Sequence, residues 1–88
     1  MQAKSDSPGV ADRRREKAFG RALQAARKKH GLSQEDLGFE SGYHRTYVSF
    51  LERGLKNPSL STIMDLATTL GMSASELVLQ TENILREK

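Results

Sequence analysis

Apolar side chains recur at helical spacing along most of the chain. Phe19, Leu23 and Ala26 follow one another at i, i+4 and i+7 within the charged segment from Asp12 to His30, which is typical of an amphipathic helix. No segment alternates apolar and polar residues over a useful length. We therefore predict an all-α domain of five helices. The four helices that follow the first are expected at about Ser33–Ser41, Arg45–Arg53, Ser59–Leu70 and from Ser73 toward Arg86.

Serine and glycine mark the predicted helix ends. Ser33, Ser59 and Ser73 stand where an N-cap hydroxyl is favoured, and glycines follow the predicted helices as C-terminal stops. Residues 1–11 are polar and include Pro8 and Gly9, so we expect a flexible basic arm there. The folded domain is predicted over residues 12–82, with residues 83–88 as a tail that could extend the fifth helix.

Two short helices around Gly42 form the most informative stretch of the sequence. A tight turn between crossing helices often needs a positive φ, which glycine adopts without strain. Gly38 lies inside the first of these helices, and we attribute it to a close approach by the second. Leu37, Val48 and Leu51 are expected on the buried side of the pair, which leaves the opposite face of the second helix outward.

Charge is distributed unevenly along the chain. Residues 1–30 carry nine basic and three acidic side chains (9 − 3 = +6), whereas residues 31–88 carry five and eight (5 − 8 = −3). This asymmetry favours a polyanionic partner at one end of the molecule, although a solvated helix face and a basic arm explain it as well.

Several classes of protein are disfavoured by what the sequence lacks. It has no cysteine and no apolar run long enough to cross a bilayer, and the beginning of the chain lacks the apolar segment of a signal peptide, so we expect a cytoplasmic location. His30 and His44 are the only histidines and have no metal-ligand spacing or neighbouring nucleophile. We predict no enzymatic activity, no metal, no cofactor, no membrane association and no small-molecule ligand.

Four separated motifs resemble those of the lambda-repressor-like helix-turn-helix family, also called Cro-type or xenobiotic-response-element type. They match the family in their order along the chain and in their spacing. The resemblance covers roughly Phe19 to Leu79. The motifs are SQEDL, SGYHRTYVSFLERG, NPSL and DLATTLGMSASEL. The resemblance implies a five-helix DNA-binding domain whose recognition helix, about residues 44–53, enters the major groove of double-stranded DNA.

The resemblance also implies roles for individual positions. His44, Arg45, Thr46, Ser49 and Phe50 match base-reading positions. Gln34, Tyr47, Lys56 and Asn57 match positions that touch phosphates, and the basic Arg13, Arg14 and Arg15 are expected to add attraction to the DNA backbone. Phe50 departs from the usual polar residue, so packing in the core or at a dimer contact is its alternative role. Arg27 and Glu52 match a structural salt bridge, for which the alternative is two solvated charges.

These expectations lead to a functional hypothesis with two alternatives. The hypothesis is a homodimeric transcriptional regulator of a palindromic operator, similar to restriction-modification controller proteins or to a phage repressor. Leu77, Val78, Ile84 and Leu85 of the fifth helix are the expected dimer interface. The alternatives are an antitoxin-type regulator that also binds a toxin, and a non-specific nucleic-acid-binding module.

Overall fold

The computed structural model describes residues 12–87 and contains five α-helices in that range. The predicted all-α, five-helix fold is therefore confirmed, while the predicted arm, residues 1–11, lies outside the described residues. The last helix continues past residue 82 to Leu85, within the tail for which an extension of the fifth helix was predicted. The helices are α1 (Arg14–Lys29), α2 (Gln34–Ser41), α3 (Arg45–Glu52), α4 (Leu60–Thr69) and α5 (Ala74–Leu85).

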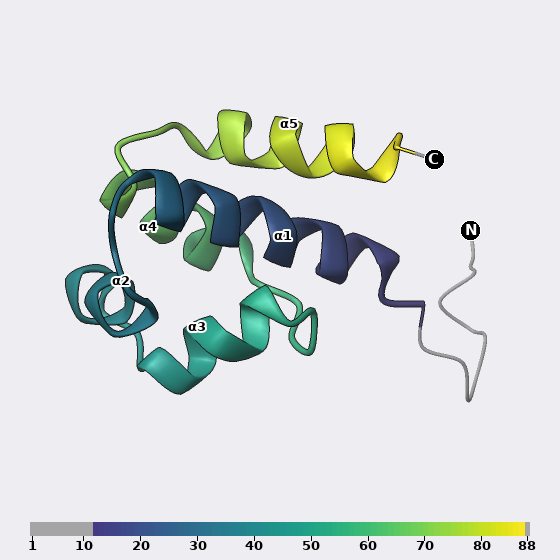
Figure 1. Ribbon diagram of the computed structural model, residues 1–88. Coiled ribbons are helices and arrows are strands. Elements are labelled where there is room, and N and C mark those ends of the chain that lie inside the picture. The colour runs from purple at the N-terminus through teal and green to yellow at the C-terminus, as the bar shows by residue number, and fades with distance from the viewer. Residues whose placement is uncertain (1–11, 88) are drawn as a thin grey trace.

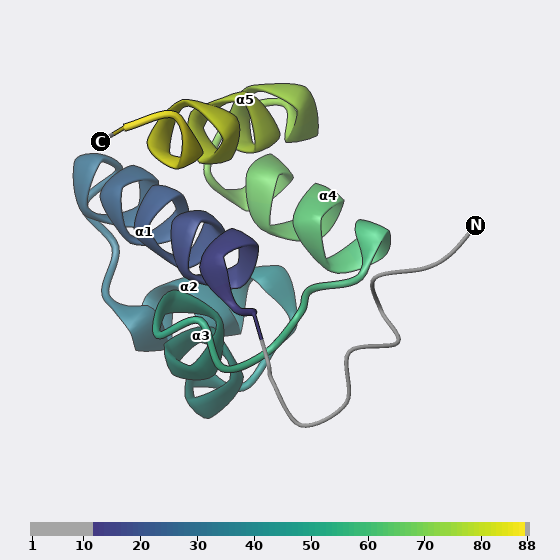
Figure 2. The ribbon, with the colours of Figure 1, turned by 90° about the vertical axis from the view of Figure 1, so that its right-hand side faces the viewer.

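Helix α1 lies at the centre of the arrangement. It packs against α5 on one side and against α3 on the other, as both ribbon views show (Figures 1 and 2). Helix α2 contacts α3 and α4, and α4 contacts α5. The α2–α3 pair therefore lies on the opposite side of α1 from α5, so that α3 keeps one face free of other helices.

One core joins all five helices. Its largest fully buried side chains come from every helix in turn: Leu23 of α1, Leu37 of α2, Val48 and Leu51 of α3, Leu66 of α4 and Leu77 of α5. The prediction that Leu77 contributes to a dimer interface is thus wrong, because its side chain is 0% exposed within a single chain. Ile84 is half-buried against the same core.

A glycine sets how closely α1 approaches α3. A Cβ atom on Gly20 would collide with the backbone carbonyl oxygens of Leu51 and Glu52, at the end of α3. Because main-chain atoms have little room to move aside, this crossing requires a residue without a side chain. The contact fixes the end of α3 against the centre of the domain.

None of the helices within residues 12–87 has both the length and the apolar character that crossing a bilayer requires.

Candidate nucleic-acid interface

The α2–α3 pair is built from local capping signals. The Ser33 hydroxyl accepts a hydrogen bond from the Asp36 amide (2.9 Å), and the Asp36 carboxylate accepts one from the Ser33 amide (3.2 Å). This capping box satisfies two amides and fixes the start of α2. Helix α2 ends at Gly42, whose φ of 87° is in the left-handed region, as the sequence predicted.

Gly38 permits the tight turn into α3. A Cβ atom at this position would lie 2.5 Å from the Tyr43 carbonyl oxygen and 3.1 Å from the Arg45 amide nitrogen. The close approach expected at Gly38 is present, and it is made by the backbone of the turn and the first residue of α3. Leu37, Val48 and Leu51 form the buried side of the pair, as predicted, and each is 0% exposed.

Most of the predicted base-reading residues share one hollow at the surface. Arg45 and Thr46 are exposed, Ser49 and Phe50 are half-buried, and all four line a shallow depression between α3 and the start of α2. Ser33, Gln34 and Glu35 form its α2 side. The hollow combines hydrogen-bonding groups, a guanidinium and an aromatic ring on one helix face, which is the mixture of chemistry that base edges require.

Phe50 faces this hollow and is absent from the buried core cluster. The Arg53 guanidinium carbon lies 5.9 Å from the centre of the Phe50 ring, at cation–π distance. Arg53 lines the same hollow but was missed by the sequence analysis. The sequence does contain a signal for it: Arg53 follows Arg45 by eight residues and Ser49 by four, and this spacing places all three on one helix face.

Arg27 and Glu52 form the ion pair that the sequence predicted. Arg27 donates from Nε to Glu52 Oε2 (2.6 Å) and from Nη2 to Oε1 (2.9 Å), and its Nη1 donates to the Leu32 carbonyl (2.9 Å). The two side chains are only 10% and 2% exposed. The hydrogen bonds from Arg27 to Glu52 raise the pKa of Arg27 above its ordinary value. The pair ties α1 to the end of α3.

Gln34 adds a third member to this network. Its side-chain amide donates to Glu52 Oε1 (3.0 Å), which connects the first residue of α2 to the last residue of α3. The Gln34 side chain is therefore engaged within the protein, and its expected phosphate contact rests on its backbone amide, at the free start of a helix. We refer to Arg27, Gln34 and Glu52 together as the brace.

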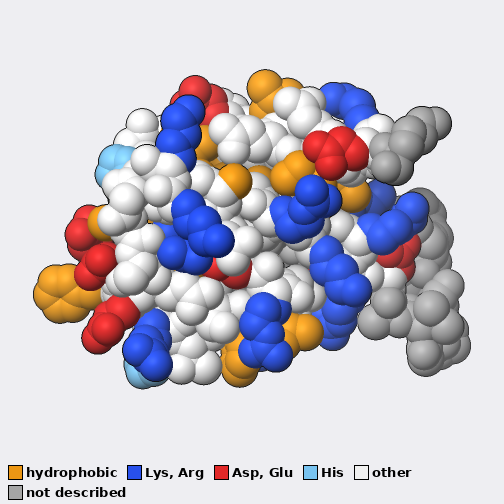
Figure 3. All heavy atoms as spheres, viewed as in Figure 1, with side chains coloured by type: hydrophobic (Ala, Val, Ile, Leu, Met, Phe, Trp, Pro, Cys, Tyr) orange, Lys and Arg blue, Asp and Glu red, His pale blue; other side chains and the backbone are white. Residues whose placement is uncertain are grey.

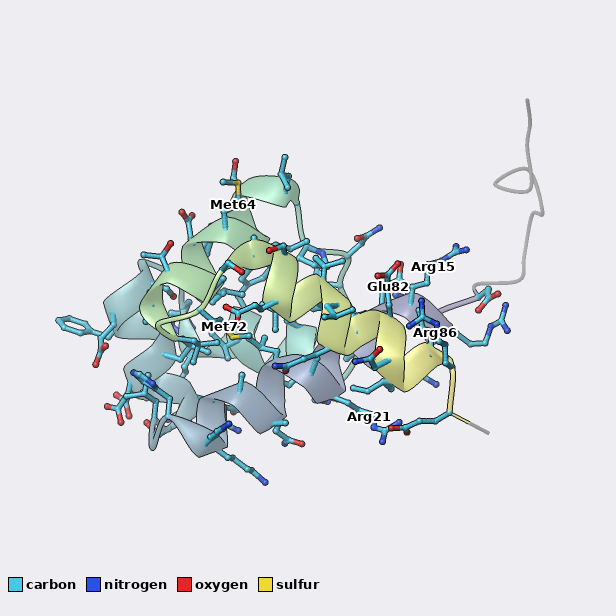
Figure 4. The ribbon with its side chains drawn as sticks, turned by 90° about the horizontal axis from the view of Figure 1, so that it is seen from above. Arg15, Arg21, Met64, Met72, Glu82 and Arg86 are labelled. Atoms are coloured by element: carbon cyan, nitrogen blue, oxygen red, sulfur yellow. The ribbon has the colours of Figure 1, made fainter. Side chains whose placement is uncertain are left out.

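The structure separates the three arginines at the start of the chain. Arg13 Nη1 donates to the Leu55 carbonyl (3.2 Å), which places Arg13 beside the loop that contains Lys56 and Asn57. Arg14 pairs with Asp12 (3.0 Å), and both side chains are well exposed. Arg15 instead lines a groove between α1, α4 and α5 and lies near Glu82 in the view from above (Figure 4).

Charge is distributed by region on the surface. Lys and Arg side chains are spread over the face that includes α1 and α3, whereas acidic side chains gather at the α2 end (Figure 3). Arg45 and Glu35 meet at 3.8 Å with both side chains largely exposed, so solvent screens this contact and it holds Arg45 only weakly.

A braced pair of short helices with a free, polar outer face defines a helix-turn-helix DNA-binding protein. The helix-turn-helix family HTH_3 matches residues 23–77, which is more than half of the chain. The protein therefore belongs to this XRE-type, lambda-repressor-like family of transcriptional regulators.

Relatives and solved structures agree with this assignment. The chain is 41% identical over 66 residues to the uncharacterized HTH-type transcriptional regulator y4dJ of Sinorhizobium fredii, covering 75% of this chain and 86% of that protein. It is 41% identical over 61 residues to the control protein C.BamHI of Bacillus amyloliquefaciens, covering 68% and 75%. The restriction-modification controller protein C.AhdI of Aeromonas hydrophila has a similar structure, with a TM-score of 0.69, 47% identity and coverage of 70% of this chain and 94% of that one.

Proposed function

We propose that the protein is a homodimeric transcriptional regulator that reads a specific duplex sequence with α3 in the major groove. The observation that carries the proposal is the outer face of α3, where Arg45, Thr46, Ser49 and Phe50 share one open hollow. Arg45 supplies the bidentate donors suited to guanine, and Phe50 supplies apolar contact for a thymine methyl group. The brace ties the last residue of α3 to α1 and to the start of α2.

The rim of this face has the groups needed to contact phosphates. Lys56 and Asn57 are exposed in the loop after α3, and Arg13 hydrogen-bonds to the same loop. Tyr47 and the backbone amide at Gln34 complete the proposed phosphate contacts, and Arg14 adds long-range attraction. Such contacts fix the register of a protein on DNA without reading its sequence.

A homodimer is proposed because one α3 reads only a short half-site. Val78 and Leu85 are each 40% exposed on α5 and, at i and i+7, share one face. On α4, Leu60 (71% exposed) and Met64 (52% exposed) add further apolar surface. Helices α4 and α5 pack against each other, and Ile63 of α4 lines the same groove as Val78 of α5, so these two surfaces are neighbours. Figure 4 shows Met64 projecting from α4 into the solvent. We define this α4–α5 face as Leu60, Met64, Val78 and Leu85.

The biological role we propose is that of a restriction-modification controller. The support is the similarity to the control protein C.BamHI and to the structure of C.AhdI. A regulator of this kind would act on its own operon and on the neighbouring endonuclease gene.

Selection from random duplex DNA, followed by affinity measurements at several salt concentrations, tests the proposal. We expect enrichment of a palindromic site whose half-site centres are about 34 Å apart, one turn of DNA. Affinity for this site should exceed that for random DNA by at least about a thousandfold. Equal binding to all sequences with a steep salt dependence would instead support the non-specific alternative, and no DNA binding would favour a protein-binding role such as that of an antitoxin.

A further inference from the structure

The N-cap of α3 differs chemically from the other side-chain caps in the described residues. Helices α2, α4 and α5 begin after Ser33, Ser59 and Ser73, and each of these hydroxyls accepts a hydrogen bond from a backbone amide. Helix α3 begins after His44, whose ring nitrogen Nδ1 accepts from the Thr46 amide at 3.0 Å. A serine hydroxyl accepts at any ordinary pH, whereas an imidazole nitrogen accepts only while it carries no proton.

This hydrogen bond fixes the state of the ring. With Nδ1 as the acceptor, the neutral ring must carry its hydrogen on Nε2, on the far side of the exposed side chain. Protonation of Nδ1 would turn the acceptor into a second donor facing the Thr46 amide. The cap would then be lost, and a positive charge would stand at the positive end of the helix dipole.

We propose that His44 is a positioning residue that holds the first turn of α3 in its binding geometry only in the neutral form, so that acidification releases this turn. The inference rests on the proposed function, because the turn it controls carries Arg45 and Thr46. It assigns His44 a role as a pH-dependent cap in addition to its predicted place among the base-reading residues.

The charged groups around His44 act in opposing directions. His44 lines a second surface depression together with two groups of negative charge, Glu35 and Asp36 of α2, and one of positive charge, Arg45. Glu35 is already in contact with Arg45 (3.8 Å), and Asp36 accepts from the Ser33 amide. Tyr43, which lines the same depression, donates from its hydroxyl to Asp65 of α4 (2.7 Å). Of the two carboxylates in this depression, Asp36 is held in the capping box with Ser33, whereas Glu35 has only the exposed, solvent-screened contact with Arg45.

The test compares wild type with His44→Asn and His44→Ala. Asparagine is a favoured N-cap whose amide oxygen does not titrate, and alanine provides no cap. Nitrogen NMR of the free protein at pH 8 should show the tautomer with hydrogen on Nε2. In a titration over about pH 8 to 5, where histidines change charge, the Thr46 amide proton shift should follow the His44 ring in wild type and stay constant in His44→Asn. These readouts do not depend on DNA binding.

The second arm measures affinity for the selected operator at constant ionic strength. At pH 8, His44→Asn should bind more tightly than His44→Ala, since loss of a cap costs about 1 kcal/mol, or about fivefold. Between pH 8 and pH 5.5, the affinity of wild type should fall toward that of His44→Ala, while His44→Asn changes little. His30, the other histidine, is present in all three proteins and so does not distinguish them.

The outcomes separate this inference from the proposed function. A ring with its hydrogen on Nδ1, or a Thr46 amide that ignores the His44 titration, overturns the inference whatever the DNA result. Wild-type affinity that rises on acidification while His44→Asn stays flat also overturns it, because His44 would then act as a cation toward phosphate. Failure of every variant to prefer any sequence would count against the proposed function, and would refute the part of the inference that concerns DNA.

Discussion

At the scale of single residues, Arg45 and Lys56 should have distinguishable roles. Arg45 lines the α3 hollow, whereas Lys56 is exposed in the following loop. We expect Arg45→Ala to relax the preference at one base pair of each half-site by about 1–3 kcal/mol. Lys56→Ala, the matched control, should weaken binding to all sequences alike and lower the salt slope by about one per contact. Uniform weakening by Arg45→Ala in competition assays would instead make Arg45 a phosphate contact.

Phe50 should recognise a thymine by its methyl group. A ring on the outer face of α3 offers no hydrogen bond, so its contribution must come from apolar contact. Replacing that thymine by uracil removes one methyl group, worth about 0.8 kcal/mol or a fourfold loss of affinity. The measurement is the affinity of wild type and of Phe50→Ala for a series of operators, in each of which one thymine is replaced by uracil. The loss should disappear in Phe50→Ala at one position per half-site, and its persistence there would show that another residue reads the methyl group.

At the scale of helices, the brace should couple α1 to α3 energetically. Both carboxylate oxygens of Glu52 accept hydrogen bonds from Arg27, and the pair is largely buried. Glu52→Leu leaves the Arg27 charge buried without a partner and should lower the free energy of unfolding by about 3 kcal/mol. The double variant Arg27→Met/Glu52→Leu should regain much of that loss, as measured by urea unfolding. Additive losses would show that the two residues do not interact.

Helix boundaries could be predicted because the signals that set them are local. Ser33, Ser73 and Gly42 occupy the capping positions expected of them, since each acts on amides or dihedral angles within a few residues. Features that depend on distant contacts were not predictable in this way. Periodicity marks Leu77 as apolar, but only the packing of α5 on α1 shows that it faces the core.

In the candidate site too, features set by local sequence could be predicted and features set by contacts between distant segments could not. The outer face of α3 follows from helical spacing together with the family resemblance. The hydrogen bond from Gln34 to Glu52 depends on how α2 crosses α3, and the need for glycine at Gly20 depends on how α1 crosses α3. Neither crossing is encoded in a short stretch of sequence, so periodicity and capping signals could not reveal them.

At the scale of the whole molecule, we expect the α4–α5 face to form the homodimer that brings two copies of α3 to one operator. Val78 lines the groove that Ile63 and Phe19 also form, whereas Leu79 points about 100° away around the same helix. Both residues are substantially exposed, so an aspartate at either position should leave the fold intact. We expect Val78→Asp to be monomeric at low micromolar concentration and Leu79→Asp to remain dimeric, as measured by sedimentation and light scattering.

The loss of dimerisation should appear in DNA binding as lost avidity. Two linked half-site contacts typically bind about 10²- to 10⁴-fold more tightly than one, so Val78→Asp should lose most of its affinity for the palindrome while keeping its weak affinity for a single half-site. Leu77→Ala provides the contrasting control, because removal of a core side chain should cost about 2–5 kcal/mol of stability. Leu77→Ala should therefore unfold at a lower temperature than wild type, whereas Val78→Asp should keep the wild-type unfolding behaviour and lose only dimer formation. A Val78→Asp protein that stays dimeric and binds the palindrome normally would place the dimer contact on another surface.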